Sequence, residues 1–206
     1  MADRDAVDAR PAPRIGSPPN LLGIARILAT PIVAALVLIG APGMGIAGFV
    51  VFALAALTDY FDGWLARRRD EVSPLGVFMD LTADKVLVAG VLVAMVEAGL
   101  LPTWMVGTIV IRELVVSGVR QVAAADNLVI AAKPLGKAKT ATTLIGMAAL
   151  LLAFDARTGG PLAAFGDLAA LGVGGYWIMV VATILTVISG WDYVRGALPL
   201  LRGRTG

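Results

Sequence analysis

The sequence contains no cysteine and no histidine. The absence of cysteine excludes disulfide bonds and thiol nucleophiles. The absence of histidine removes the commonest general base and the commonest metal ligand, so acid–base chemistry would fall to carboxylates, lysine or tyrosine. Any metal site must then be built from oxygen ligands, which favours Mg²⁺, Mn²⁺ or Ca²⁺ over zinc or copper.

Charged residues are also scarce. They make up 16% of the 206 residues, and apolar residues make up 58%. Soluble domains average about 25% charged residues, so this composition indicates a polytopic membrane protein. The basic residues lie mostly in short connections between apolar runs, and a soluble basic patch of the kind that binds nucleic acid is not expected.

Six apolar runs are each long enough to cross a bilayer as a helix, which takes about 20 residues. They are residues 21–39, 44–67, 75–98, 101–124, 135–154 and 168–193. Glycine and proline residues typical of turns separate several of them. The sequence therefore predicts an all-α protein with six transmembrane helices. Residues 20–206 would form this membrane domain, after an N-terminal tail of residues 1–19.

The basic residues predict the orientation of these helices. Arginine and lysine precede the first run, join the second to the third and the fourth to the fifth, and follow the sixth, whereas the opposite connections hold only Arg157. Basic loops tend to stay on the cytoplasmic side. We therefore expect an integral protein of a bacterial-type cytoplasmic membrane. Both termini and a polar active-site cavity would face the cytoplasm.

Four aspartates interrupt the apolar pattern near the second connection. Asp59 and Asp62 are three residues apart and Asp80 and Asp84 are four apart, so each pair shares a helical face. Carboxylates at membrane depth are costly, and four together would repel one another and take up protons. Bound divalent cations would offset both costs and create a phosphate-binding centre. Solvation, or pairing with the neighbouring arginines, is the plainer alternative.

Three small residues and an arginine accompany these aspartates. Gly63, Ala66 and Gly76 would let a flat ligand approach a helix closely, although such residues also serve ordinary helix packing. Arg67 supplies a guanidinium suited to a phosphate.

The eight positions form the pattern Asp-x2-Asp-Gly-x2-Ala-Arg-x8-Gly-x3-Asp-x3-Asp. This pattern resembles the signature of the CDP-alcohol phosphotransferase family at every position. The resemblance implies a six-helix membrane enzyme, usually a homodimer, in which Asp59, Asp62 and Asp80 bind two Mg²⁺ or Mn²⁺ ions. It implies that Asp84 is the general base and also touches a metal ion. The CDP pocket that it implies is lined by Asp59, Asp62, Gly63, Ala66, Arg67 and Gly76.

Basic residues in the fourth and fifth runs bear on the acceptor. They are Arg112, Arg120, Lys137 and Lys139. A single cation of this kind commonly extends to lipid headgroups, but four facing an acidic site favour a pocket for a phosphorylated acceptor. Arg112 lies deepest and needs an anion, and the adjacent Glu113 is expected to point elsewhere.

Three segments resemble the phosphatidylglycerophosphate synthase branch of the family: residues 19–26, 111–120 and 136–140. The likeness to the family continues to residues 189–193. It implies transfer of the phosphatidyl group of CDP-diacylglycerol, within the lipid bilayer, to sn-glycerol 3-phosphate. A phosphatidylinositol-phosphate synthase, or another branch of the family, remains an alternative. A cation transporter is an alternative of a different class, although its acids would be spread through the membrane.

Overall fold

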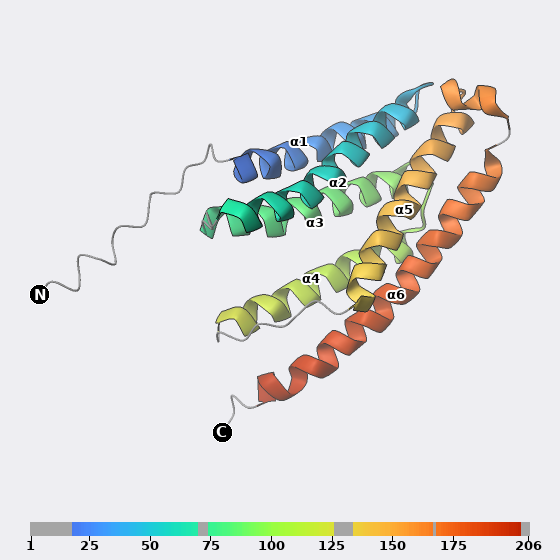
Figure 1. Ribbon diagram of the computed structural model, residues 1–206. Helices are drawn as coiled ribbons and strands as arrows, with labels where there is room; N and C mark the ends of the chain where they lie inside the picture. The colour runs from blue at the N-terminus through green and yellow to red at the C-terminus, as the bar shows by residue number, and fades with distance from the viewer. Residues whose placement is uncertain (1–17, 70–73, 126–133, 167, 203–206) are drawn as a thin grey trace, which may run out of the picture.

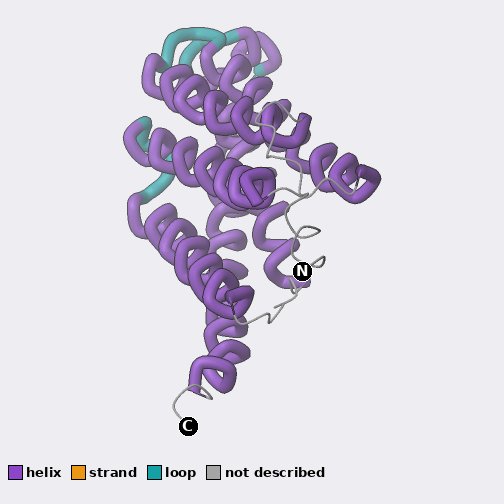
Figure 2. The backbone as a smooth tube through the Cα atoms, turned by 90° about the vertical axis from the view of Figure 1, so that its left-hand side faces the viewer, coloured by secondary structure: helices purple, strands orange, loops and turns teal. Residues whose placement is uncertain are grey.

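The computed structural model describes residues 18–69, 74–125, 134–166 and 168–202, and side chains at positions 21–58, 82–124, 134–166 and 168–196. Over these ranges the chain forms six α-helices and one short 3₁₀ helix, with no strand (Figure 1, Figure 2). The elements are α1 (Pro18–Ile39), α2 (Met44–Arg69), α3 (Pro74–Glu97), α4 (Thr103–Ala125), α5 (Pro134–Arg157), η1 (Pro161–Phe165) and α6 (Ala169–Arg202).

The six predicted helices are all present. The sixth was predicted to end near Tyr193, but α6 continues to Arg202, because charged side chains near a helix end do not by themselves interrupt its backbone hydrogen bonds. Residues 18 and 19, predicted as part of the tail, begin α1. The remainder of the predicted tail, residues 1–17, lies outside the described residues.

Helices α1, α2 and α3 form one group, in which α1 packs against both of the others, and α5 packs along α6. Figure 1 shows α4 and α6 on the other side of the bundle from α1 and α2. The contact between α1 and α3 depends on Gly90, because a Cβ atom there would overlap the side-chain methyl group of Thr30. Met95, Met147 and Met179 are fully buried in the core, where flexible thioether side chains fill irregular gaps.

Three helices in the described part of the chain are long and apolar enough to cross a membrane. They are Leu21–Ile39, Pro134–Arg157 and Ala169–Gly196. Large apolar side chains also cover the outside of the bundle, and Leu114 and Trp191 are each 64% exposed. Soluble monomers rarely present so much contiguous apolar surface, so this exterior suits contact with lipid.

Successive helices run in opposite directions along the bundle (Figure 1). The C-terminal ends of α2, α4 and α6 lie toward one end, and the α1–α2 turn and η1 lie toward the other (Figure 1). The α1–α2 turn uses Gly40 and Gly43 with φ of 61° and 85°, a left-handed conformation that glycine adopts without steric cost.

Asp155 connects the elements at the end of the bundle where the α1–α2 turn and η1 lie. Its side chain is fully buried, and its carboxylate accepts hydrogen bonds from the backbone N–H of Ile46 and of Leu162, each at 3.1 Å. These groups lie in the first turns of α2 and η1, where backbone donors lack partners within the helix. A Cβ atom at Gly45 or Gly160 would overlap Asp155. One carboxylate therefore joins α2, α5 and η1.

We expect Asp155→Asn to lower the stability of the folded protein by about 2 kcal/mol or more, because an amide leaves one buried N–H unsatisfied. The measurement is the thermal midpoint of the purified protein in detergent. Glu97→Gln is the control, since Glu97 is an exposed carboxylate at the end of α3. Equal midpoints for the two variants would contradict this role for Asp155.

Candidate active site

A cavity of about 530 Å³ lies between α3, α4 and α5. Its volume is in the range of small-molecule binding sites, roughly 300–1,000 Å³. Asp84 from α3, Arg120 from α4 and Lys139 from α5 all line it. The fold thus brings the predicted general base together with two of the four cations predicted to bind the acceptor phosphate.

The side chains in this cavity differ in exposure. Asp84 and Arg120 are exposed, whereas Lys139 is buried, with 4% of its surface accessible. Lys85 and Glu113 complete the charged lining, and neither was predicted as a site residue. Among the described side chains, the cavity therefore holds two carboxylates and three cations, and the cations suit an anionic ligand.

Glu113 joins two of the predicted cations. Its Oε1 atom accepts a hydrogen bond from Arg112 Nη1 at 2.8 Å and another from Lys139 Nζ. The expectation that Glu113 points away from Arg112 is therefore wrong. Consecutive side chains leave a helix in different directions, but arginine and glutamate are long enough to bend toward each other, and Lys139 of α5 attracts the same carboxylate.

Arg112 does not line the cavity. Its Nη2 atom donates a hydrogen bond to Ser189 Oγ at 3.0 Å, and its guanidinium carbon lies 5.8 Å from the centre of the Tyr193 ring. Both partners belong to α6 and lie in a segment, 189–193, that the family resemblance reached without assigning it a role. Lys137 is exposed on α5 and is also absent from the cavity lining.

The remaining motif residues lie in the helices that were predicted for them. Asp59, Asp62, Gly63, Ala66 and Arg67 are in α2, and Gly76 and Asp80 are in α3. Their side chains lie outside the described positions, and among the described side chains no group of three or more potential metal ligands occurs. Asp84 is the one motif carboxylate with a described environment, and its exposure to the cavity fits an oxygen ligand for a hard cation such as Mg²⁺.

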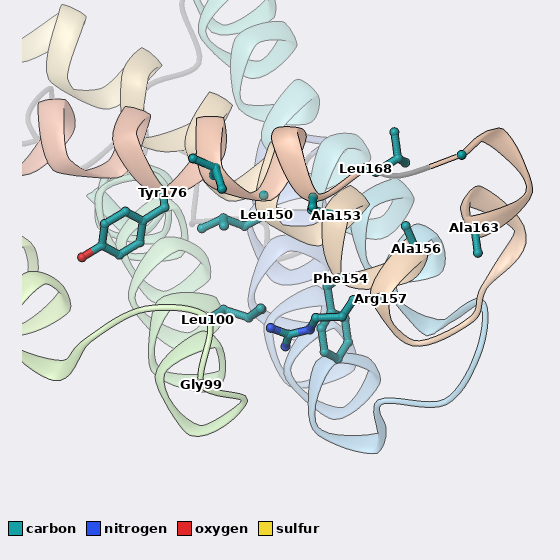
Figure 3. A pocket seen from close by; sticks show the side chains of 14 residues that line it. Gly99, Leu100, Leu150, Ala153, Phe154, Ala156, Arg157, Ala163, Leu168 and Tyr176 are labelled. Atoms are coloured by element: carbon teal, nitrogen blue, oxygen red, sulfur yellow. The ribbon is translucent and has the colours of Figure 1, made fainter.

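A second cavity, of about 550 Å³, lies at the other end of the bundle (Figure 3). Among the described residues that line it, Arg157 is the one that is charged, and its guanidinium carbon lies 5.6 Å from the centre of the Phe154 ring. The rest of the lining is mostly apolar, with Tyr176 on α6. This cavity offers no described carboxylate that could act as a base, so the first cavity is the better candidate for catalysis.

The chain is similar to a known protein family and to named enzymes. A family model described as CDP-alcohol phosphatidyltransferase matches residues 17–188. A Bacillus subtilis (strain 168) protein named CDP-diacylglycerol–glycerol-3-phosphate 3-phosphatidyltransferase is 37% identical over 190 residues, covering 85% of this chain and 92% of that protein.

Two further relatives have different names. A probable phosphatidylglycerophosphate synthase of Mycobacterium tuberculosis is 32% identical, over 90% of this chain and 83% of that protein. A cardiolipin synthase (CMP-forming) of rice is 33% identical, over 74% of this chain but only 50% of its own length.

The contact between Arg112 and α6 predicts opposite effects for two glycine substitutions on that helix. A Cβ atom at Gly190 would lie 2.9 Å from Arg112 Cγ, whereas one at Gly174 would meet nothing within 4 Å. We expect Gly190→Ala to destabilise the protein by about 1–3 kcal/mol through overpacking. Gly174→Ala should be neutral or slightly stabilising, because alanine favours the helix by up to about 1 kcal/mol. Thermal midpoints of the two variants in detergent, compared with wild type, check this difference in sign.

Proposed function

This chain belongs to the CDP-alcohol phosphatidyltransferase family, and we propose that it transfers the phosphatidyl group of CDP-diacylglycerol to sn-glycerol 3-phosphate. The observation that carries this proposal is the cavity in which Asp84 lies with Arg120 and Lys139. It combines a carboxylate able to take a proton with cations able to hold a phosphate. The names of the relatives from Bacillus subtilis and Mycobacterium tuberculosis support the same acceptor.

The acceptor phosphate would bind to Arg120 and Lys139. Arginine offers a planar pair of donors for phosphate oxygens, and lysine adds a compact charge. Arg120 lies on the exposed rim and Lys139 is buried, so the phosphate would sit between an accessible and a deep cation. Arg112 and Lys137, which do not line the cavity, would contribute to the electrostatic field around it.

In the reaction that we propose, Asp84 accepts the proton of the primary hydroxyl of glycerol 3-phosphate. The oxygen then attacks the phosphorus that carries diacylglycerol. A new phosphorus–oxygen bond forms, the bond from that phosphorus to the CMP oxygen breaks, and CMP leaves with the electron pair. Holding both substrates in one cavity supplies much of the rate enhancement, since it converts a bimolecular encounter into a local one.

We also propose that Asp59, Asp62, Asp80 and Asp84 hold two divalent cations, Mg²⁺ or Mn²⁺. Carboxylate oxygens are the ligands that these ions prefer. When bound, the ions would neutralise the pyrophosphate of CDP-diacylglycerol. Gly63, Ala66, Arg67 and Gly76, together with Asp59 and Asp62, would form the cytidine diphosphate pocket.

We propose six membrane spans with the cavity and both termini on the cytoplasmic side, and a homodimer in the membrane. Alternation of the helix ends in Figure 1 is compatible with six crossings. The basic residues of α2 and α6 lie toward the C-terminal ends of those helices, which supports a cytoplasmic orientation for that end.

Release of CMP with a panel of acceptors tests the function. Purified protein with CDP-diacylglycerol and Mg²⁺ should release CMP with glycerol 3-phosphate, and release should stop when EDTA removes the metal. Inositol phosphate, inositol, serine and phosphatidylglycerol are the comparison acceptors, and the last of these is included because of the cardiolipin synthase relative. Release with inositol phosphate alone would overturn the acceptor assignment and keep a phosphate-binding pocket. Cation flux in liposomes without CMP release would support a transporter instead.

Asp84→Asn should lower turnover by about 10²–10⁴-fold, the usual contribution of a general base. Binding of CDP-diacylglycerol, measured with a radiolabelled lipid, should be weakened far less. Glu97→Gln is the control on the same helix. Turnover of Asp84→Asn close to that of wild type would exclude Asp84 as the base.

A further inference from the structure

Two cations converge on one oxygen of Glu113. Arg112 Nη1 lies 2.8 Å from Oε1, and Lys139 Nζ donates to the same atom. The side chain of Glu113 is 27% exposed, that of Arg112 12% and that of Lys139 5%. Glu113 is therefore partly accessible at the cavity wall, whereas the side chain of Lys139, which also lines the cavity, is almost fully buried.

Of the two cations, Lys139 depends more on its bond to Glu113. In the described part of the chain, Glu113 is the only hydrogen-bond partner of Lys139 Nζ. An ammonium group with so little access to water is costly to bury unless a carboxylate lies beside it. A lysine has three donors, so the bond to Glu113 leaves donors for a ligand in the cavity.

Arg112 fixes Glu113 from the opposite side. The guanidinium reaches past Gly190 to donate to Ser189, and it lies over the ring of Tyr193. Since α6 is the helix against which α4 packs most, these bonds hold Arg112 within that contact. The contacts form a continuous path from α6 through Arg112 and Glu113 to Lys139 on α5.

We propose that Glu113 is a positioning residue of the acceptor site: it holds and directs the side chain of Lys139 so that Lys139 and Arg120 together receive the acceptor phosphate. Arg112 then holds Glu113 in place and does not touch the substrate. A direct contact of Glu113 with the phosphate is disfavoured, because two anions repel. The identity of the acceptor rests on the proposed function, but the pairing of Glu113 with Lys139 does not.

Chemical labelling tests the pairing without any assay of activity. Wild type and Glu113→Gln, purified in detergent, are treated with an amine-reactive acetylating reagent at mildly alkaline pH, and modified peptides are quantified by mass spectrometry. Lys137, exposed on the same helix, is the internal control. In wild type, Lys139 should be acetylated much more slowly than Lys137. Glu113→Gln should raise labelling of Lys139 several-fold and leave Lys137 unchanged.

Two further variants sharpen the labelling experiment. Glu113→Asp keeps the negative charge. Lys139 should therefore be acetylated less in Glu113→Asp than in Glu113→Gln. Glu97→Gln removes a carboxylate that does not line the cavity, and both lysines should be acetylated in it as they are in wild type. Unchanged labelling of Lys139 in Glu113→Gln would overturn the proposal, whatever the activity of the variant.

A double-mutant cycle tests the consequence for the acceptor. Glu113→Gln should raise the KM for glycerol 3-phosphate by about tenfold, equivalent to about 1.4 kcal/mol, and leave the KM for CDP-diacylglycerol unchanged. If Glu113 acts through Lys139, the double variant Glu113→Gln/Lys139→Gln should have the same KM as Lys139→Gln alone. If the KM of the double variant is instead raised by the product of the two single effects, Glu113 contacts the acceptor itself. That result would overturn the positioning role.

The two proposals fail in different ways. Absence of CMP release by wild type with every acceptor would refute the proposed function, and the labelling result would still decide the pairing. If wild type uses a different phosphorylated acceptor, the double-mutant cycle is measured with that acceptor. It then distinguishes a positioning role of Glu113 from a direct contact in the same way.

Discussion

Charged groups inside a bundle that faces lipid need partners within the protein, because the surrounding hydrocarbon offers none. In this chain, one carboxylate meets that need for two cations: Glu113 pairs with Arg112 and Lys139. The pairing bridges α4 and α5 through long side chains, and the hydrogen bond of Arg112 to Ser189 connects it to α6. The basic side of the cavity therefore depends on an acid that the sequence pattern alone did not single out.

A comparable arrangement secures the other end of the molecule with different chemistry. There the partners of Asp155 are backbone N–H groups at the start of α2 and η1. Between the two ends the helices are held by buried apolar side chains and by glycines that let backbones approach closely. The cavity beside Asp84 lies where such contact is sparse, since α3 touches α4 at few positions.

This distribution suggests how the site combines rigidity with access. Lys139 is buried and fixed by Glu113, whereas Asp84 and Arg120 are exposed to the cavity. A ligand would thus meet an accessible base and an accessible guanidinium first, with a preorganised ammonium group behind them. Groups held in advance in the geometry they need cost less to order when the substrate binds.

The sequence by itself determined the number and approximate bounds of the helices, because long apolar runs and turn-forming residues are local properties. It also determined the family, because eight motif positions at fixed spacing depend on the order of residues alone. It could not determine which basic residues share the cavity, since that depends on how α4, α5 and α6 rotate and pack. Only the tertiary structure brought Arg120 and Lys139 to Asp84, placed Arg112 behind them, and turned Glu113 toward both of its partners. Such contacts join residues far apart in the chain, and neither spacing nor composition encodes the direction of a long side chain.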